Sequence, residues 1–223
     1  MHVPGRAVIF DVDGVLVDSY DAHMRSWLLM GREHGLTITE EQFASTFGQT
    51  SREIIARFWG SDLSREDAEA LGARKEAIYR DLIRERFPAM DGSVELIDAL
   101  ADAGFRLAVG SSGPPENVEL TLDCLGRASR FNAVVTGRDI TRGKPDPQVF
   151  QIAAERLGLP PARCIVVEDA PVGITAARAA GMASVALVGT VAADRLGEAD
   201  LVVRSLRELL DVSRLAALLE RAP

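Results

Sequence analysis

The hydrophobic pattern begins with a short apolar run at residues 7–10, which leads directly into Asp11 and Asp13. Such a run, ending at an aspartate turn, is typical of a strand buried in a parallel sheet. Beyond residue 91, similar runs at 107–109, 131–136, 164–167, 184–188 and 201–203 alternate with helical periodicity, and a terminal helix is expected at 205–219. This alternation predicts an α/β fold: a Rossmann-like parallel sheet core with right-handed crossovers.

A long stretch of helical character, residues 19–89, separates the first strand from the rest of this pattern. Three capping-box sequences begin helices within it, at Thr39, Thr50 and Ser64, because each is followed three residues later by Gln, Glu or Asp. A connection of this length is not a simple loop. The sequence therefore predicts an α/β core of residues 1–18 and 90–223 with an all-α domain, 19–89, inserted after the first strand.

Composition and charge narrow the classes of partner. A net charge of −8 argues against nucleic acid or an acidic membrane surface, because both are bound by basic patches. No apolar run approaches the ~20 residues of a membrane helix, and no signal-peptide core is visible. The two cysteines, Cys124 and Cys164, lie among apolar neighbours, which predicts buried thiols and a cytoplasmic location. A monomer and a homodimer are both compatible with the sequence.

The candidate chemistry is concentrated where predicted strands end. Parallel strands deliver their carboxyl ends to one edge of a sheet, so these residues are expected to share a site. Singly, each has a simpler interpretation: a turn-forming aspartate, an ordinary serine loop, a solvated lysine or a helix cap. Their order along the chain favours the common site. In sequence order, the residues at the four strand ends are Asp11 and Asp13, Ser111 and Ser112, Lys144, and Glu168 and Asp169.

These residue types indicate phosphoryl transfer. Clustered carboxylates repel one another unless a cation is present, and oxygen ligands favour Mg²⁺, whereas no His/Cys spacing supports zinc. A carboxylate can attack phosphorus and form an aspartyl-phosphate if the charge on the transferred oxygens is neutralised. Mg²⁺ and Lys144 would neutralise it, while the Ser111 hydroxyl and backbone N–H groups near Ser112 hold the remaining oxygens. Asp13 is the candidate general acid that protonates the leaving alkoxide.

The motifs resemble those of the haloacid dehalogenase superfamily, in the branch that includes phosphoglycolate phosphatase and β-phosphoglucomutase. Residues 10–19, Phe-Asp-Val-Asp-Gly-Val-Leu-Val-Asp-Ser, resemble its first motif, with Asp11 in the nucleophile position and Asp13 in the acid/base position. Residues 109–112, 143–147 and 167–174 resemble the second, third and fourth motifs.

The resemblance also implies a metal site and a reaction class. It implies Mg²⁺ bound by the Asp11 side chain, the Asp13 backbone carbonyl and Asp169, with Glu168 in or near the outer shell. Dehalogenase members lack the second aspartate, so the presence of Asp13 argues against dehalogenation.

The inserted domain matches the family's helical cap, which closes over the site and excludes water. Asp21-Ala22-His23 resembles the start of the cap in β-phosphoglucomutase-like proteins, where the matching histidine couples cap position to acid/base readiness; His23 is otherwise a helix-surface histidine. Residues 47–52 resemble the cap's substrate loop, in which Arg52 would pair with a second anionic group unless it is simply solvated. Residues 112–116 lack a lysine that several mutase relatives use for the sugar phosphate.

The sequence thus predicts a cytoplasmic Mg²⁺-dependent phosphatase that acts on a small phosphorylated metabolite, a sugar phosphate or phosphoglycolate-like acid. The alternative is a β-phosphoglucomutase-type mutase; a non-catalytic binding protein is a third interpretation, against which the intact residue set argues. Catalytic roles are predicted for Asp11, Asp13, Ser111 and Lys144, and metal contacts for Asp11, Asp13, Glu168 and Asp169. Substrate contacts are predicted for Gly14, His23, Gly48, Arg52, Ser112 and Gly113.

Overall fold

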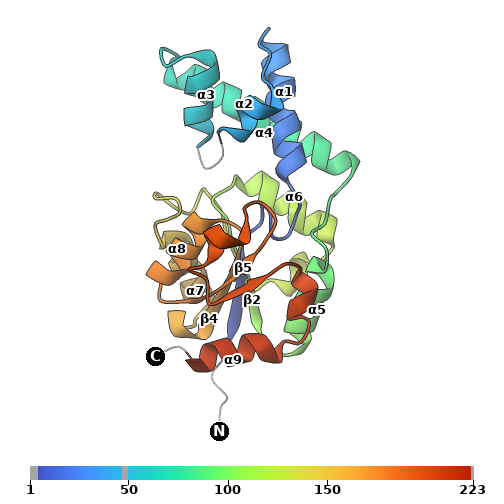
Figure 1. The fold of residues 1–223 in the computed structure, drawn as a ribbon, viewed down its shortest axis with the longest axis vertical. Coiled ribbons are helices and arrows are strands. Elements are labelled where there is room, and N and C mark those ends of the chain that lie inside the picture. Colours follow the sequence, from blue (N-terminus) through green and yellow to red (C-terminus); the bar gives the residue numbers. More distant parts are fainter. Residues whose placement is uncertain (1–4, 47–49, 222–223) are drawn as a thin grey trace. The chain divides into compact units, whose positions relative to one another are not determined.

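The computed structural model describes residues 5–46 and 50–221 and divides into two compact units (Figure 1). The core unit comprises the described residues up to Asp18 and those from Ala89 onward, and the helical unit comprises those within Ser19–Pro88. The action of the helical unit as a cap over the site stays a prediction. Over the described part of the chain, none of the helices combines the length and apolar character needed to cross a bilayer.

The core unit is built on a six-stranded sheet in which every pairing is parallel. Its order, β3-β2-β1-β4-β5-β6, is that of a Rossmann fold, so the predicted fold class is confirmed. The first strand lies at the centre, where the connections leave in opposite directions (Figure 1). The strands are β1 Ala7–Phe10, β2 Arg106–Gly110, β3 Ala133–Val135, β4 Cys164–Glu168, β5 Ala183–Leu187 and β6 Leu201–Val203.

Helices connect these strands and cover the sheet. The residues of β1 are all buried, and those of β4 likewise, as expected of strands inside a parallel sheet. In α8, the small side chains of Ala176 and Ala177 are fully buried and let that helix approach the sheet closely. The helices are α5 Ser93–Asp102, α6 Pro115–Leu125, α7 Gln148–Leu157, α8 Pro171–Ala179 and α9 Ser213–Arg221, with 3₁₀ turns η1 Ala128–Arg130, η2 Pro161–Arg163, η3 Ala193–Leu196 and η4 Leu206–Leu209.

Two expectations about this unit are wrong. The predicted continuous helix at 205–219 is broken into η4 and α9, because Asp211 accepts hydrogen bonds from the backbone N–H and hydroxyl of Ser213 and thereby starts a new helix. Cys164 is buried, and burial raises the pKa of its thiol to about 11. Cys124 is exposed on α6, whose buried face is formed by other positions such as Thr121 and Leu125.

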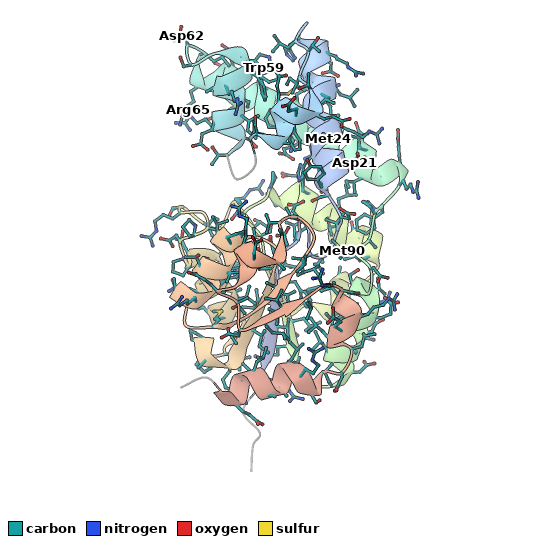
Figure 2. The ribbon with its side chains drawn as sticks, viewed as in Figure 1. Asp21, Met24, Trp59, Asp62, Arg65 and Met90 are labelled. Carbon is teal, nitrogen blue, oxygen red and sulfur yellow. The ribbon has the colours of Figure 1, made fainter. Side chains whose placement is uncertain are left out.

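The helical unit contains α1 Tyr20–Glu33, α2 Glu40–Ala44, α3 Ser51–Trp59 and α4 Arg65–Glu85. The capping boxes at Thr39 and Thr50 form as predicted. At Ser64 only one half of the capping box forms. The Ser64 hydroxyl accepts a hydrogen bond from the Asp67 N–H, but the short Asp67 side chain accepts from that hydroxyl and not from the Ser64 backbone N–H. A separate apolar core holds the helices together, with Met24 and Trp59 packed at its partly buried edge (Figure 2). The fully buried part of this core is Trp27, Met30, Phe43, Ile54, Ile55, Leu71 and Ile78.

Candidate active site

The register of the sheet brings three strand ends level. Phe10 of β1 is paired with Val109 of β2 and with Val167 of β4, and the Asp11 N–H continues the ladder by donating to the Val167 carbonyl at 3.0 Å. The next residues, Asp11 and Glu168, therefore lie side by side at the carboxyl edge. This edge at the central strand is the topological switch point, where open α/β sheets bind their ligands.

Lys144 lies between these two carboxylates. Its Nζ is 2.9 Å from Asp11 Oδ1 and 2.7 Å from Glu168 Oε1, and it lies 5.0 Å from the centroid of the Phe150 ring. The Lys144 side chain is only 9% exposed, so it is not the solvated surface cation of the simpler interpretation. A lysine from the loop after β3 is thereby fixed against the ends of β1 and β4.

Glu168 has both carboxylate oxygens engaged. Oε1 accepts from Lys144, and Oε2 accepts from the backbone N–H groups of Asp169 and Ala170, each at 2.8 Å. These N–H groups lie at the start of α8, where the helix dipole favours a negative charge. Glu168 is therefore both a helix cap and a member of the acidic cluster, and its bonds leave it better suited to an outer shell than to direct metal contact.

Three buried carboxylates converge at this point, those of Asp11, Glu168 and Asp169, and their ligand oxygens lie within 4.8 Å of one another. Burial raises the pKa of Asp11 to about 7, with Lys144 opposing the rise and Glu168 and Asp13 adding to it. Burial also raises the pKa of Asp169 to about 8, and the charges of Glu168 and Asp11 add to this. Burial disfavours the charged form of Lys144, but the two neighbouring carboxylates outweigh it and raise the pKa of that ammonium.

This donor set fits a divalent cation. Three carboxylates face a single ammonium, so the cluster carries excess negative charge when it is ionised, and its ligand atoms are all oxygens. Hard cations such as Mg²⁺ select oxygen ligands and need only one or two carboxylates. Burial and the neighbouring carboxylates raise the pKa values of Asp11 and Asp169, and a bound cation would oppose this rise.

The serine loop after β2 is held by the segment that follows β3. The Ser111 N–H donates to the Val135 carbonyl at 3.0 Å, and the Gly137 N–H donates to the Gly113 carbonyl at 2.8 Å. The buried Ser111 Oγ accepts from the Gly113 N–H at 3.0 Å, which leaves its own proton available for an anion. Ser112 is exposed beside it. The loop thus presents hydroxyl and backbone donors at the same sheet edge as Asp11.

The turn after β1 carries Asp13 and Gly14. Gly14 has φ +72°, and a Cβ atom there would overlap the Asp169 carboxylate and come within 2.8 Å of Thr190 Oγ1, so only glycine fits. Asp13 Oδ2 lies 3.8 Å from the position of a Cβ on Gly113, which directs this carboxylate toward the serine loop. Gly14 therefore lies against a candidate metal ligand, and its predicted contact with substrate stays a prediction.

In the helical unit, His23 is not the plain surface histidine of the simpler interpretation. Its ring is stacked on Tyr79 with centroids 4.2 Å apart, and its Nδ1 lies 2.7 Å from Lys75 Nζ. Arg52 is exposed in the first turn of α3, where its predicted contact with an anion stays a prediction. Gly48 lies outside the described residues.

Two buried or partly buried polar residues were missed by the sequence analysis. Lys75 is 2% exposed and bonds Glu76 as well as His23, and its position four residues after Leu71 and three before Ile78 places it on the apolar stripe of α4. Thr190 follows the fifth strand, and its hydroxyl lies beside the Asp169 carboxylate. The strand-end argument, applied to β5 as well, would have found it.

Comparisons with known proteins identify the family of this chain. A model of the haloacid dehalogenase-like hydrolases matches residues 6–181. Validoxylamine A 7'-phosphate phosphatase of Streptomyces hygroscopicus subsp. limoneus is 33% identical, covering 92% of this chain and 95% of its own. Hexitol phosphatase A of Escherichia coli (strain K12) is 34% identical, covering 92% and 93%. The crystal structure of β-phosphoglucomutase from Clostridium difficile has 26% identity and a TM-score of 0.84, covering 97% of each chain. This chain therefore belongs to the haloacid dehalogenase-like hydrolase family, as its four motifs predict.

Proposed function

We propose that this chain is a Mg²⁺-dependent phosphoric monoester hydrolase that acts on a small phosphorylated metabolite through an aspartyl-phosphate on Asp11. The observation that carries the proposal is the position of Lys144 between Asp11 and Glu168, with Asp169 completing a buried acidic cluster. A cation and several carboxylates at the carboxyl edge of a parallel sheet suit the binding and transfer of a phosphoryl group.

In the first step, a carboxylate oxygen of Asp11 forms a bond to phosphorus while the bond from phosphorus to the ester oxygen breaks. Lys144, 2.9 Å from Asp11 Oδ1, favours the ionised form of that carboxylate against its burial and offers positive charge to the transferred oxygens. The Ser111 hydroxyl and the neighbouring backbone N–H groups bind the oxygens that remain. Asp13 gives its proton to the departing alkoxide, because an unprotonated alkoxide leaves poorly.

In the second step, the aspartyl-phosphate is hydrolysed. Asp13, now ionised, accepts a proton from a water molecule, whose oxygen bonds to phosphorus as the bond to Asp11 breaks. Inorganic phosphate leaves, and both carboxyl groups return to their starting states. The direction of Asp13 toward the serine loop supports this double role, since the loop binds the same phosphoryl group.

The Asp11 side chain, the backbone carbonyl of Asp13 and the Asp169 side chain would hold Mg²⁺. When bound, the ion supplies positive charge that stabilises the developing charge on the phosphoryl oxygens. Glu168 supports the arrangement from the outer shell through its bonds to Lys144 and to the start of α8.

The substrate class is proposed from the relatives. The names of two of them specify a validoxylamine A 7'-phosphate phosphatase and a hexitol phosphatase. Both match nearly the whole of this chain, so a sugar phosphate or similar polyol phosphate is the proposed class of substrate. Action in the cytoplasm, as a monomer or homodimer, is part of the same prediction.

A β-phosphoglucomutase-type reaction is the second candidate, favoured by the structural similarity to that enzyme. A mutase must hold its sugar phosphate while it reorients, which requires strong contacts to the distal phosphate. Residues 112–116, which are Ser, Gly, Pro, Pro and Glu, include no lysine for that contact, and Glu116 is paired with Arg138 at 3.1 Å. Net release of phosphate is therefore expected to dominate.

The experiment is a panel of phosphorylated metabolites assayed with Mg²⁺ and again with chelator. The expected result is phosphate release from a sugar or polyol phosphate that disappears with chelator and returns with Mg²⁺. β-Glucose 1-phosphate with a trace of the bisphosphate forms a separate arm. Glucose 6-phosphate appearing much faster than inorganic phosphate would overturn the phosphatase proposal in favour of the mutase, and Arg52→Ala would then abolish that product.

A further inference from the structure

Thr190 lies in the loop that follows β5, at a fifth strand end of the core sheet. The loop is anchored on both sides of this residue, because Val188 and Val191 pack against a buried cluster of Ile174, Ala186 and Leu196. The Val188 N–H also donates to the Val203 carbonyl of β6 at 2.8 Å. Because the loop is fixed to α8 and to two strands, the position of Thr190 is set by the core of the unit.

The Thr190 hydroxyl is directed at the acidic cluster. It lies beside the Asp169 carboxylate and opposes the rise in the pKa of that group. The absence of a side chain at Gly14 makes room for both groups, since a Cβ atom there would overlap the Asp169 carboxylate and come within 2.8 Å of Thr190 Oγ1. Asp169, Gly14 and Thr190 therefore meet at one point, reached from β4, β1 and β5.

We infer that Thr190 is a positioning residue that fixes the orientation of the Asp169 carboxylate for a divalent cation; the inference rests on the proposed metal site. Asp169 sits on the loop between β4 and α8, and rotation about its side-chain bonds would redirect its oxygens. Lys144 bonds Asp11 and Glu168. The Thr190 hydroxyl, which lies beside Asp169, would give that carboxylate the corresponding hydrogen bond.

A hydrogen bond of this kind has a geometric consequence for metal binding. It keeps one carboxylate oxygen turned toward Thr190, so that the other oxygen is held toward the cluster. Outer partners of metal ligands typically contribute about 10- to 100-fold in metal affinity. Since the loop is partly exposed and water can replace the hydroxyl in part, we expect a loss near the lower end, about tenfold.

The test measures Mg²⁺ affinity without substrate, from the rise in melting temperature of the full chain as MgCl₂ is added. Thr190→Val removes the hydroxyl and keeps the shape, and Thr190→Ser restores the hydroxyl. Thr175→Val is the matched control, because the exposed Thr175 hydroxyl donates to the Pro171 carbonyl of its own helix. We expect Thr190→Val to need about ten times more Mg²⁺ to reach the same rise in melting temperature, whereas Thr190→Ser and Thr175→Val follow the wild type.

The turnover assay adds a second readout. At saturating Mg²⁺, Thr190→Val is expected to recover most of its kcat, so the change appears mainly in the metal concentration required. A purely structural role would instead lower the metal-free melting temperature and leave unchanged the Mg²⁺ concentration needed for a given rise, and that result overturns the inference. Wild-type protein that Mg²⁺ does not stabilise would overturn the metal site itself. If Thr190→Val fails to fold, Thr190→Ala in the same titration decides between these outcomes.

Discussion

The carboxylate of Glu168 occupies the space that a side chain at Gly173 would need. A Cβ atom built on Gly173 overlaps the whole carboxyl group of Glu168, which is fully buried and tied to Lys144 and to the first N–H groups of α8. Gly173, the third residue of α8, therefore permits the acidic cluster to form against the helix.

Gly173→Ala is expected to displace Glu168 and to lower both activity and stability. The methyl group forces the carboxylate out of its bonds to Lys144 and the Asp169 N–H, and overpacking of this kind costs about 1–3 kcal/mol. The measurements are kcat and the midpoint of urea unfolding. The control is Gly72→Ala in α4, where the nearest atom, Ile55 Cδ1, is 3.8 Å from the new Cβ and the change is expected to stabilise the helix. Unchanged kcat in Gly173→Ala would contradict the proposed role of Glu168.

Asp11→Asn is expected to remove essentially all turnover while the fold is kept. An amide cannot attack phosphorus or offer a metal a negative charge, whereas its size matches the carboxylate, so Lys144 and Glu168 keep their packing. Steady-state assays and circular dichroism measure the two effects. Retention of more than about a few per cent of the wild-type rate, in protein shown by mass spectrometry to be free of deamidation, would refute Asp11 as the nucleophile.

Asp13→Ala is expected to slow turnover by about 10²- to 10⁴-fold on an alkyl phosphate, because the leaving alkoxide then has no general acid. The loss should be smaller on an aryl phosphate, whose phenolate leaving group needs less protonation. The measurement compares kcat/KM of the variant and wild type on both substrates. Equal losses on the two substrates would show that Asp13 acts in some other way, for example only through its effect on the metal site.

Much of this architecture is encoded locally. The apolar run at 7–10 and the later apolar runs of the core form strands. Because a parallel sheet presents the carboxyl ends of its strands at one edge, Asp11, Lys144 and Glu168 meet there, as the sequence predicts. The register that places Asp11 level with Glu168 comes from hydrogen bonds between segments more than 150 residues apart, so no local pattern specifies it.

The features that the sequence analysis missed depend on long-range packing. A local sequence pattern treats Lys75 as a solvent-exposed lysine. Its burial depends on its hydrogen bonds to His23 and Glu76 and on the nearby rings of Trp27 and Tyr79. Thr190 gains its contact with Asp169 only because Gly14 leaves room for both. This contact brings together residues that follow three different strands, β1, β4 and β5.

The stability of the metal-free protein is expected to fall as pH rises from about 5 to 8. Burial raises the folded-state pKa of Asp11 from 3.8 to about 7 and that of Asp169 from 3.8 to about 8. Between these values the folded protein binds more protons than the unfolded chain, so each rise in pH favours unfolding. Ionisation of the two carboxyl groups next to Glu168 is the physical cause.

Bound Mg²⁺ should oppose this loss, because the cation stabilises the ionised carboxylates and displaces their protons on binding. The melting temperature is therefore measured from pH 5.5 to 8.5, with chelator and with Mg²⁺, and the shift produced by Mg²⁺ is expected to grow across this range. Asp11→Asn serves as the comparison, since removing one of the two titrating groups should flatten the metal-free profile. A metal-free melting temperature that rises through the same interval, or a Mg²⁺ shift that is equal at pH 6 and pH 8, would contradict the raised pKa values of Asp11 and Asp169, because these carboxyl groups would then already be ionised without the metal.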